Sequence, residues 1–229
     1  MYEVTRLIDV SPLDEPTLDA VAARIAAAAD ATGAEIALVS PTLPGVRNGG
    51  HLVAHLQFDS EDRWIGSRAA FDRATSQEPV VRVNSVEYHG SPHRPGAVGR
   101  RATGNPGAVY RTLLLRVDDS ATTDEVDRFE RALLRMPRYV DAIQAWRLSR
   151  VAVAGGDSRW THVWEQEYAD LDGLLGPYMN HPVHWASVDP FFDPENPVCL
   201  VTERVCHSFC TTDRPLIEPA SLPTESAQV

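Results

Sequence analysis

The feature that most constrains the fold is an order of elements that occurs twice along the chain. In the second half, apolar periodicity predicts a strand over residues 110–117, a helix over 122–136, strands over 142–153 and 159–168, a helix over 169–178 and a strand over 198–206. The first half predicts strands over 2–10, 34–40, 51–58 and 80–88, with helices over 14–30 and 60–74. Each half therefore has the order β-α-β-β-α-β.

This order defines the split β-α-β, ferredoxin-like unit. Its helices cover one face of the sheet, so the other apolar face must be buried against something else. Two such units in one chain can press their open faces together and close a barrel. We therefore predict an α+β fold of two tandem ferredoxin-like units with a ligand cavity between the sheets. The alternative, two separate units, would leave two apolar faces in water.

Two shifts in composition suggest the boundaries. Residues 90–107 are rich in Gly and Pro and lack apolar periodicity, which is typical of a linker, and the arginines at 94, 100 and 101 are expected to be solvated there. From residue 211 the chain becomes rich in Pro, Ser and Thr. We expect a first half over 1–90, a linker over 91–108, a second half over 109–210 and a flexible tail over 211–229.

Composition excludes several classes of function. The chain has 32 Asp and Glu residues against 21 basic residues, for a net charge of −11, so a nucleic-acid partner is not expected. All 21 basic residues are Arg. Schiff-base chemistry, pyridoxal phosphate and a Walker phosphate loop each need a lysine amine, so these are excluded.

The cellular setting is inferred from what the sequence does not contain. No apolar run reaches the roughly 18–20 residues of a membrane span, and the acidic, alternating start is unlike a signal peptide. Cys199, Cys206 and Cys210 are odd in number and form no CxxC pair, which argues against a disulfide framework or structural zinc. A cytoplasmic protein without a membrane partner is the expectation.

The most informative residues lie in the second half. Thr161 and His162 begin a predicted strand, and a Y-x-x-H-P-x-H string follows at Tyr178, His181 and His184. Over residues 108–209 these motifs resemble the stress-responsive A/B barrel (Dabb) family. The resemblance implies a dimeric α+β barrel, built here within one chain, although a Dabb-like half could instead pair between chains as a homodimer.

The resemblance also implies roles. In a plant polyketide cyclase of this family, which forms olivetolic acid, the Tyr and the last His of the string act as an acid–base pair in an aldol cyclisation. These positions are Tyr178 and His184 here, and the strand histidine of that pocket falls on His162. Two positions depart from the relative: its first-strand His is Arg111 here, and its Asp that orients the catalytic His falls near His207.

The chemistry of these residues agrees with such roles. A histidine titrates near neutral pH and can take and return a proton, and a tyrosine hydroxyl can donate to an oxygen that gains negative charge. Pro182 bars a continuous helix between Tyr178 and His184, so both can lean over a cavity. The alternative is that these side chains lock the loop by hydrogen bonds, which is the favoured interpretation for His181.

Strand alternation selects further candidates. Trp164, Gln166 and Tyr168 share a face with His162, which suits a flat, aromatic ligand unless the interior is simply packed. Each half opens with an arginine in its first strand, Arg6 and Arg111, and a buried guanidinium needs an anion. A substrate carboxylate could serve, but an internal ion pair to one of the acidic residues Glu165, Glu167 or Glu203 is favoured. The candidate ligand contacts are His162, Trp164, Arg111, His181, Arg6 and Tyr168.

The leading hypothesis is an enzyme of the lyase, cyclase or isomerase type that works without a cofactor. It would move protons beside a carbonyl on a small aromatic or polyketide-like substrate, with His184 as base and Tyr178 as donor to the oxygen. One alternative is a non-catalytic, stress-associated small-molecule-binding protein. Another is a monooxygenase of the dimeric α+β barrel type, which uses haem, a metal or substrate-activated oxygen. A metal held by His162, His181 and His184 is the less favoured interpretation, because the spacing across Pro182 is not that of a helix face.

Overall fold

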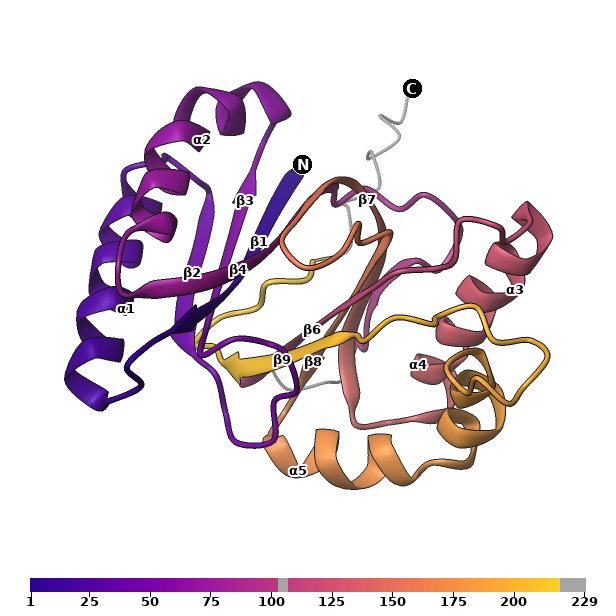
Figure 1. Cartoon of the computed structure of the whole chain (residues 1–229). Coiled ribbons are helices and arrows are strands. Elements are labelled where there is room, and N and C mark those ends of the chain that lie inside the picture. Colours follow the sequence, from indigo (N-terminus) through magenta and orange to yellow (C-terminus); the bar gives the residue numbers. More distant parts are fainter. Residues whose placement is uncertain (103–106, 219–229) are drawn as a thin grey trace, which may run out of the picture.

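The computed structural model describes residues 1–102 and 107–218 (Figure 1). Its strands are β1 (Tyr2–Val10), β2 (Ile36–Pro41), β3 (Leu52–Phe58), β4 (Val80–His89), β5 (Val98–Arg100), β6 (Val109–Leu115), β7 (Ile143–Gly155), β8 (His162–Tyr168) and β9 (Cys206–Thr211). Its helices are α1 (Glu15–Asp30), α2 (Glu61–Ser76), α3 (Thr123–Leu133), α4 (Met136–Tyr139), α5 (Leu171–Gly173), η1 (Leu174–Tyr178), η2 (His184–Val188) and η3 (Asp189–Phe191). None of the described helices is long and apolar enough to cross a membrane.

The predicted duplication is confirmed. The first unit has the strand order β2-β3-β1-β4, and the second repeats it as β7-β8-β6-β9. Local signals place the helices: Asp14 accepts from Thr17 N to cap α1, and Thr122 and Glu125 form the predicted capping box of α3. The second helix of the second unit is irregular, because η1 and η2 are π-helical and Pro177 lies inside η1.

The two units join edge to edge and nearly close a barrel. β4 pairs antiparallel with β7, from Ser85 opposite Gly155 to Tyr88 opposite Val151. On the opposite side, isolated bridges join the segment after β2 to β9, and Leu43 N donates to Phe209 O at 3.0 Å. In Figure 1, α1 and α2 cover the outer face of the first sheet, and α3 to α5 cover the outer face of the second.

The interior of the barrel is filled. Side chains from both sheets form one apolar cluster there, which includes Leu7, Tyr88, Tyr110 and Val163, all fully buried. Beside the cluster lies a buried polar network in which Arg147 contacts Glu3 and lies 3.7 Å from Glu165. The expectation of a ligand cavity between the two sheets is therefore wrong, because both sheets send large side chains into that space.

The segment predicted as a linker is built into the structure. β5 pairs with β7, and Ala97 is fully buried. Arg94 bonds Glu130 at 2.7 Å, and Arg100 bonds Glu167 at 2.7 Å. These arginines are thus not solvated: each neutralises a buried carboxylate of the second unit. Residues 103–106 of the expected linker lie outside the described residues.

The last strand lies later than predicted. Residues 198–205 form no strand. β9 begins only at Cys206, where its pairing with β6 starts opposite Leu114. The first residues of the expected tail continue the fold: Leu216 and Ile217 are buried, and their backbone N–H groups donate to Glu167 at 2.6 and 2.8 Å. The remainder of that tail, residues 219–229, lies outside the described residues.

Candidate functional site

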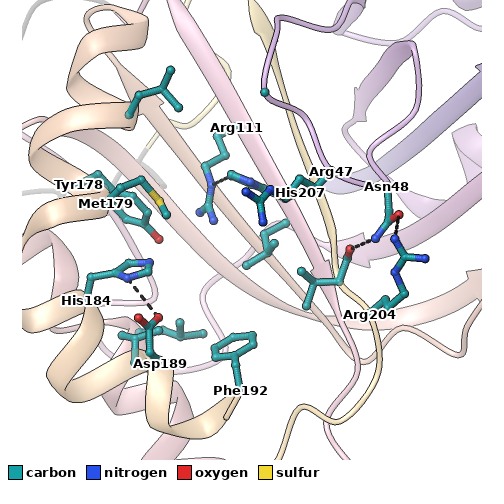
Figure 2. Close-up of a pocket in the computed structure, with 16 residues that line it drawn as sticks. Arg47, Asn48, Arg111, Tyr178, Met179, His184, Asp189, Phe192, Arg204 and His207 are labelled. Atoms are coloured by element: carbon teal, nitrogen blue, oxygen red, sulfur yellow. Dashed lines mark hydrogen bonds and ion pairs between the residues drawn. The ribbon is translucent and has the colours of Figure 1, made fainter. Parts of the chain in front are cut away.

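A cavity of about 680 Å³ lies on the outer face of the second sheet, between β6 and β9 and the helical stretch η1–η3. One wall is apolar and includes Leu133, Val188 and Phe192. The opposite rim is polar, and part of it comes from the first unit, whose loop after β2 contributes Arg47 and Asn48 (Figure 2). The cavity thus depends on the fusion of the two units, since the first supplies part of the rim of the second.

Tyr178 and His184 lie side by side in this cavity (Figure 2). Their ring centroids are 5.0 Å apart in an edge-on arrangement. Tyr178 is the last residue of η1, and His184 is the first of η2, so both stand where the helix is widened into a π turn. Such turns occur often at functional sites. Among the described residues, none forms a hydrogen bond with the Tyr178 hydroxyl.

Asp189 contacts one ring nitrogen of His184. Its Oδ1 lies 3.1 Å from His184 Nδ1. The other ring nitrogen, Nε2, has no hydrogen-bond partner among the described side chains. Burial lowers the pKa of His184, Asp189 opposes that shift, and the positive charge of Arg111 adds to it. His184 is therefore neutral at pH 7, with Nδ1–H donating to Asp189 and the Nε2 lone pair available to accept a proton.

Arg111 forms the floor of the cavity and is only 4% exposed. Its Nε donates to His207 Nε2 at 2.7 Å, and its Nη1 donates to the Gln166 side chain. Its guanidinium carbon lies 5.0 Å from the centre of the Tyr178 ring. Burial, together with the charge of Arg111, lowers the pKa of His207 to about 2, so His207 stays neutral and serves as an acceptor.

Comparison with known proteins agrees with this architecture. Residues 109–206 match the family described as the stress responsive A/B barrel domain, Dabb. The second half of the chain is a Dabb domain. No curated protein matches the chain significantly.

Several solved structures resemble almost the whole chain. An anthrone oxidase-like protein superposes with a TM-score of 0.62 at 10% identity, covering 92% of this chain and 90% of its own. A proposed monooxygenase from Fusobacterium nucleatum gives 0.56 at 8%, covering 95% and 96%. A mutant chlorite dismutase from Candidatus Nitrospira defluvii gives 0.55 at 10%, covering 92% and 91%. At such identities these likenesses show the fold alone, which is the tandem fold of the whole chain.

The other candidates on the strands of the Dabb domain lie on its helix-covered face but do not line the cavity. His162 Nε2 lies 3.2 Å from Glu130 of α3, and the His162 ring meets Phe129 edge-on at 5.8 Å. Trp164 and Tyr168 are fully buried in the core, where Tyr168 packs edge-on against Tyr178 at 5.8 Å. These residues support the wall behind Tyr178.

His181 and Arg6 are also engaged elsewhere. His181 Nδ1 accepts from the backbone N–H of Val183 at 3.1 Å and so locks the turn between Tyr178 and His184. Arg6, on the first unit, bonds Glu87 at 2.9 Å and Asp72 at 3.2 Å. Arg6 therefore forms an internal ion pair as predicted, but its partners are not the predicted Glu165, Glu167 or Glu203. Arg111 forms no such pair with Glu165, Glu167 or Glu203, because all three carboxylates are bound to other partners.

Sequence reasoning missed part of the site. Asp189 is not among the predicted site residues, although it follows His184 by five residues, which is the hydrogen-bonding spacing of a π-helix. Arg47, Asn48 and Arg204 reach the rim from distant segments, for which no local pattern gives a signal. His207 was placed near the orienting acid of the family, but it contacts Arg111 instead.

The three histidines considered for a metal do not come together in the Dabb domain, because His162, His181 and His184 each have separate partners. A different group with suitable ligand atoms lies inside the barrel, where Glu3, His55 and Glu165 place one atom each within 4.8 Å of one another. Arg147 contacts both carboxylates, so the group already holds a cation.

Proposed function

We propose that the cavity of the Dabb domain is the active site of a cofactor-independent enzyme of the lyase, cyclase or isomerase type. Its substrate would be a small aromatic or polyketide-like carbonyl compound. The observation that carries the proposal is the position of Tyr178 and the Asp189-held His184 in one cavity, with the unengaged Nε2 of His184 and the free Tyr178 hydroxyl available to the same ligand.

The proposed chemistry is proton transfer beside a carbonyl. His184 Nε2 takes a proton from the carbon next to the carbonyl. The electron pair of that C–H bond forms a carbon–carbon double bond, and the π electron pair of the carbonyl moves onto its oxygen. The Tyr178 hydroxyl donates a hydrogen bond to this oxygen and stabilises the enolate. Asp189 accepts from Nδ1–H, which fixes the tautomer and favours the imidazolium that forms. The proton then returns to the product, and His184 becomes neutral again.

The shape of the cavity supports an aromatic substrate. Leu133, Val188 and Phe192 offer an apolar wall, and Phe191 beside them packs on Phe129 at 5.4 Å. The two adjacent phenylalanines after His184 thus have different positions. Phe192 lines the cavity, and Phe191 packs the loop against Phe129. A volume of about 680 Å³ accommodates a ring with side chains.

The experiment that tests the proposal is exchange of hydrogen for deuterium at the carbon beside the carbonyl. A panel of aryl ketones and 1,3-diketones is incubated with the protein in D₂O, and loss of the α-proton signal is followed by NMR. His184→Ala and Tyr178→Phe are each expected to slow exchange by about 10²–10⁴-fold. His89→Ala and Tyr139→Phe, at exposed positions far from the cavity, are the matched controls. Wild-type exchange rates in the His184 and Tyr178 variants would remove the mechanism.

A monooxygenase is the second candidate, favoured by the names of the anthrone oxidase-like and monooxygenase neighbours. Removal of a proton from an enolisable aromatic ketone also precedes its reaction with oxygen, so the same two residues would serve. An oxygen electrode separates the two functions: stoichiometric consumption of oxygen with substrate favours the oxygenase, and exchange without consumption favours the lyase or isomerase. A ligand that binds without either reaction would indicate the non-catalytic binding protein.

A further inference from the structure

The cavity differs from the rest of the chain in its charge. The protein has a net charge of −11, yet the side chains around this cavity include Arg47, Arg111 and Arg204 and a single carboxylate, that of Asp189. Asp189 is engaged by His184. Within residues 1–102 and 107–218, none of the three arginines lies within ion-pair distance of a carboxylate, whereas Arg6, Arg94, Arg100 and Arg147 all do.

Arg111 is the decisive member of this group. Two of its nitrogens are held by neutral acceptors, His207 and Gln166, so the direction of its guanidinium is fixed. Its Nη2 donates to no described residue, and the side chain lines the cavity although it is almost completely buried. A buried cation without an anion is costly, and neutral acceptors compensate only part of that cost.

Arg6 provides an internal comparison. It lies on the first strand of the first unit, as Arg111 lies on the first strand of the second. Each guanidinium lies over an aromatic ring from the later helical region of its own unit, α2 for Arg6 and η1 for Arg111. The distances to the ring centres are 5.3 Å for Arg6 over Trp64 and 5.0 Å for Arg111 over Tyr178. Arg6 has two carboxylates of its own, whereas Arg111 lines an open cavity and has no carboxylate within ion-pair distance among the described residues.

We propose that Arg111 is the binding site for a carboxylate of the substrate. This inference rests on the proposed function, since it specifies the substrate of the same cavity: an aromatic carbonyl compound that carries a carboxylic acid. The single buried guanidinium matches a single negative charge, and the carboxylate would accept from Arg111 Nη2 while the carbonyl faces Tyr178 and His184.

Arg47 and Arg204 complete the arrangement at the rim. Both are exposed, and Arg204 is positioned by Asn48, whose Oδ1 accepts from Arg204 Nη2 at 2.8 Å (Figure 2). Asn48 in turn donates to Val205 O at 3.2 Å. Two positive charges at the entrance of an otherwise acidic protein attract anions and repel cations, which raises the rate of anion capture at low salt.

The test compares a carboxylic acid with a neutral molecule of the same shape. Binding of 4-acetylbenzoate, 4-acetylbenzamide and 4-acetylphenyl phosphate is measured by isothermal titration calorimetry at low ionic strength. We expect the acid to bind at least about 10-fold more tightly than the amide, consistent with one charge-assisted hydrogen bond. Arg111→Gln should abolish that preference, whereas Arg111→Lys should keep part of it. Arg138→Gln, an exposed position away from the cavity, controls for the change in net charge.

Three results would overturn the inference: equal affinity for acid and amide, an acid that does not bind at millimolar concentration, or an unchanged preference in Arg111→Gln. Tighter binding of the phosphate than of the acid would also contradict the choice of a carboxylate. Because these are binding measurements, they are independent of turnover. A wild-type protein that catalyses deuterium exchange but shows no preference for the acid would refute this inference alone. A wild-type protein that prefers the acid but catalyses no exchange would refute the proposed function alone.

Discussion

His184 Nδ1 lies 3.1 Å from Asp189 Oδ1, and both residues belong to one continuous helical stretch. The resemblance to the Dabb family predicts an orienting acid near His207, on the last strand. In this chain His207 contacts Arg111, and the acid beside His184 comes from the same helical stretch as the histidine. The contact between His184 and Asp189 is therefore made within one segment, and neither residue belongs to β9.

The first prediction concerns the titration of His184. Burial and Arg111 both disfavour the imidazolium, and Asp189 favours it, so the two neighbours have opposite effects on the pKa of His184. Asp189→Asn should lower this pKa below its wild-type value, and Arg111→Gln should raise it. Two-dimensional NMR of the imidazole signals against pH measures both shifts. Shifts of the same sign in the two variants would show that the arrangement is wrong.

The second prediction contrasts the two corresponding arginines. Arg6→Gln leaves the buried carboxylate of Glu87 without its closest cation and should lower the free energy of unfolding by about 3–5 kcal/mol. Arg111→Gln removes a buried charge that has no counterion, so it should leave stability unchanged or increase it. Urea denaturation of both variants gives the comparison. A larger loss for Arg111→Gln than for Arg6→Gln would indicate that Arg111 is a structural residue.

The third prediction concerns the buried network inside the barrel. Burial and the nearby Glu165 raise the pKa of Glu3 to about 8, although Arg147 partly opposes the shift. In the folded protein Glu3 therefore keeps its proton at pH values where Glu3 of the unfolded chain has already lost it. The contribution of this difference to the free energy of unfolding is complete below the ordinary pKa of a glutamate and is lost as the pH rises through about 8.

The glutamine side chain of Glu3→Gln cannot ionise, so the free energy of unfolding of this variant should change less with pH. The difference in unfolding free energy between Glu3→Gln and the wild type should shift in favour of the variant by a few kcal/mol between pH 5 and pH 9. Urea denaturation at several pH values measures it, and Glu15→Gln on the exposed start of α1 is the control. Parallel profiles for Glu3→Gln and wild type would mean that Glu3 is ionised throughout.

The fourth prediction concerns the segment after β9. A chain that stops after Thr212 loses the buried side chains of Leu216 and Ile217 and leaves Glu167 without two donors. We expect a loss of roughly 3–6 kcal/mol in unfolding free energy from the apolar burial alone. A chain that stops after Glu218 keeps all these contacts and should match the full-length protein in thermal denaturation. Equal melting temperatures for the two truncations would contradict the role of this segment.

Much of the architecture could be predicted from the sequence because it depends on local patterns. Alternation in β1 and β8, the capping box at Thr122 and the Gly and Pro residues between elements all act over a few residues. The last strand was misplaced because residues 198–206 are as apolar as a strand. Only the pairing of β9 with β6, a contact between distant segments, decides where that strand begins.

Part of the site was also predictable from a local pattern in the sequence. Tyr178 and His184 lie in one short motif, so the motif alone brings them together. Alternation predicted that Trp164, Gln166 and Tyr168 share a face with His162, but it could not decide which face of the sheet holds the cavity. That depends on how fully the barrel interior is packed, which involves residues from both units, such as Leu7 and Val163. The part of the cavity rim that comes from the loop after β2 likewise depends on contacts between the two units.

Fusion of the two units determines how many ligand molecules we expect each chain to bind. The first unit fills the space beneath its helices with Trp64 and Phe71 and neutralises Arg6 internally, so that half serves as scaffold. A barrel assembled from two identical chains would present two equivalent chambers related by symmetry. Here the chamber with Tyr178 and His184 belongs to the second unit, and apolar side chains pack the corresponding space of the first unit. Titration should accordingly saturate at a single equivalent of ligand per polypeptide, and no cooperativity between twin chambers can arise within it.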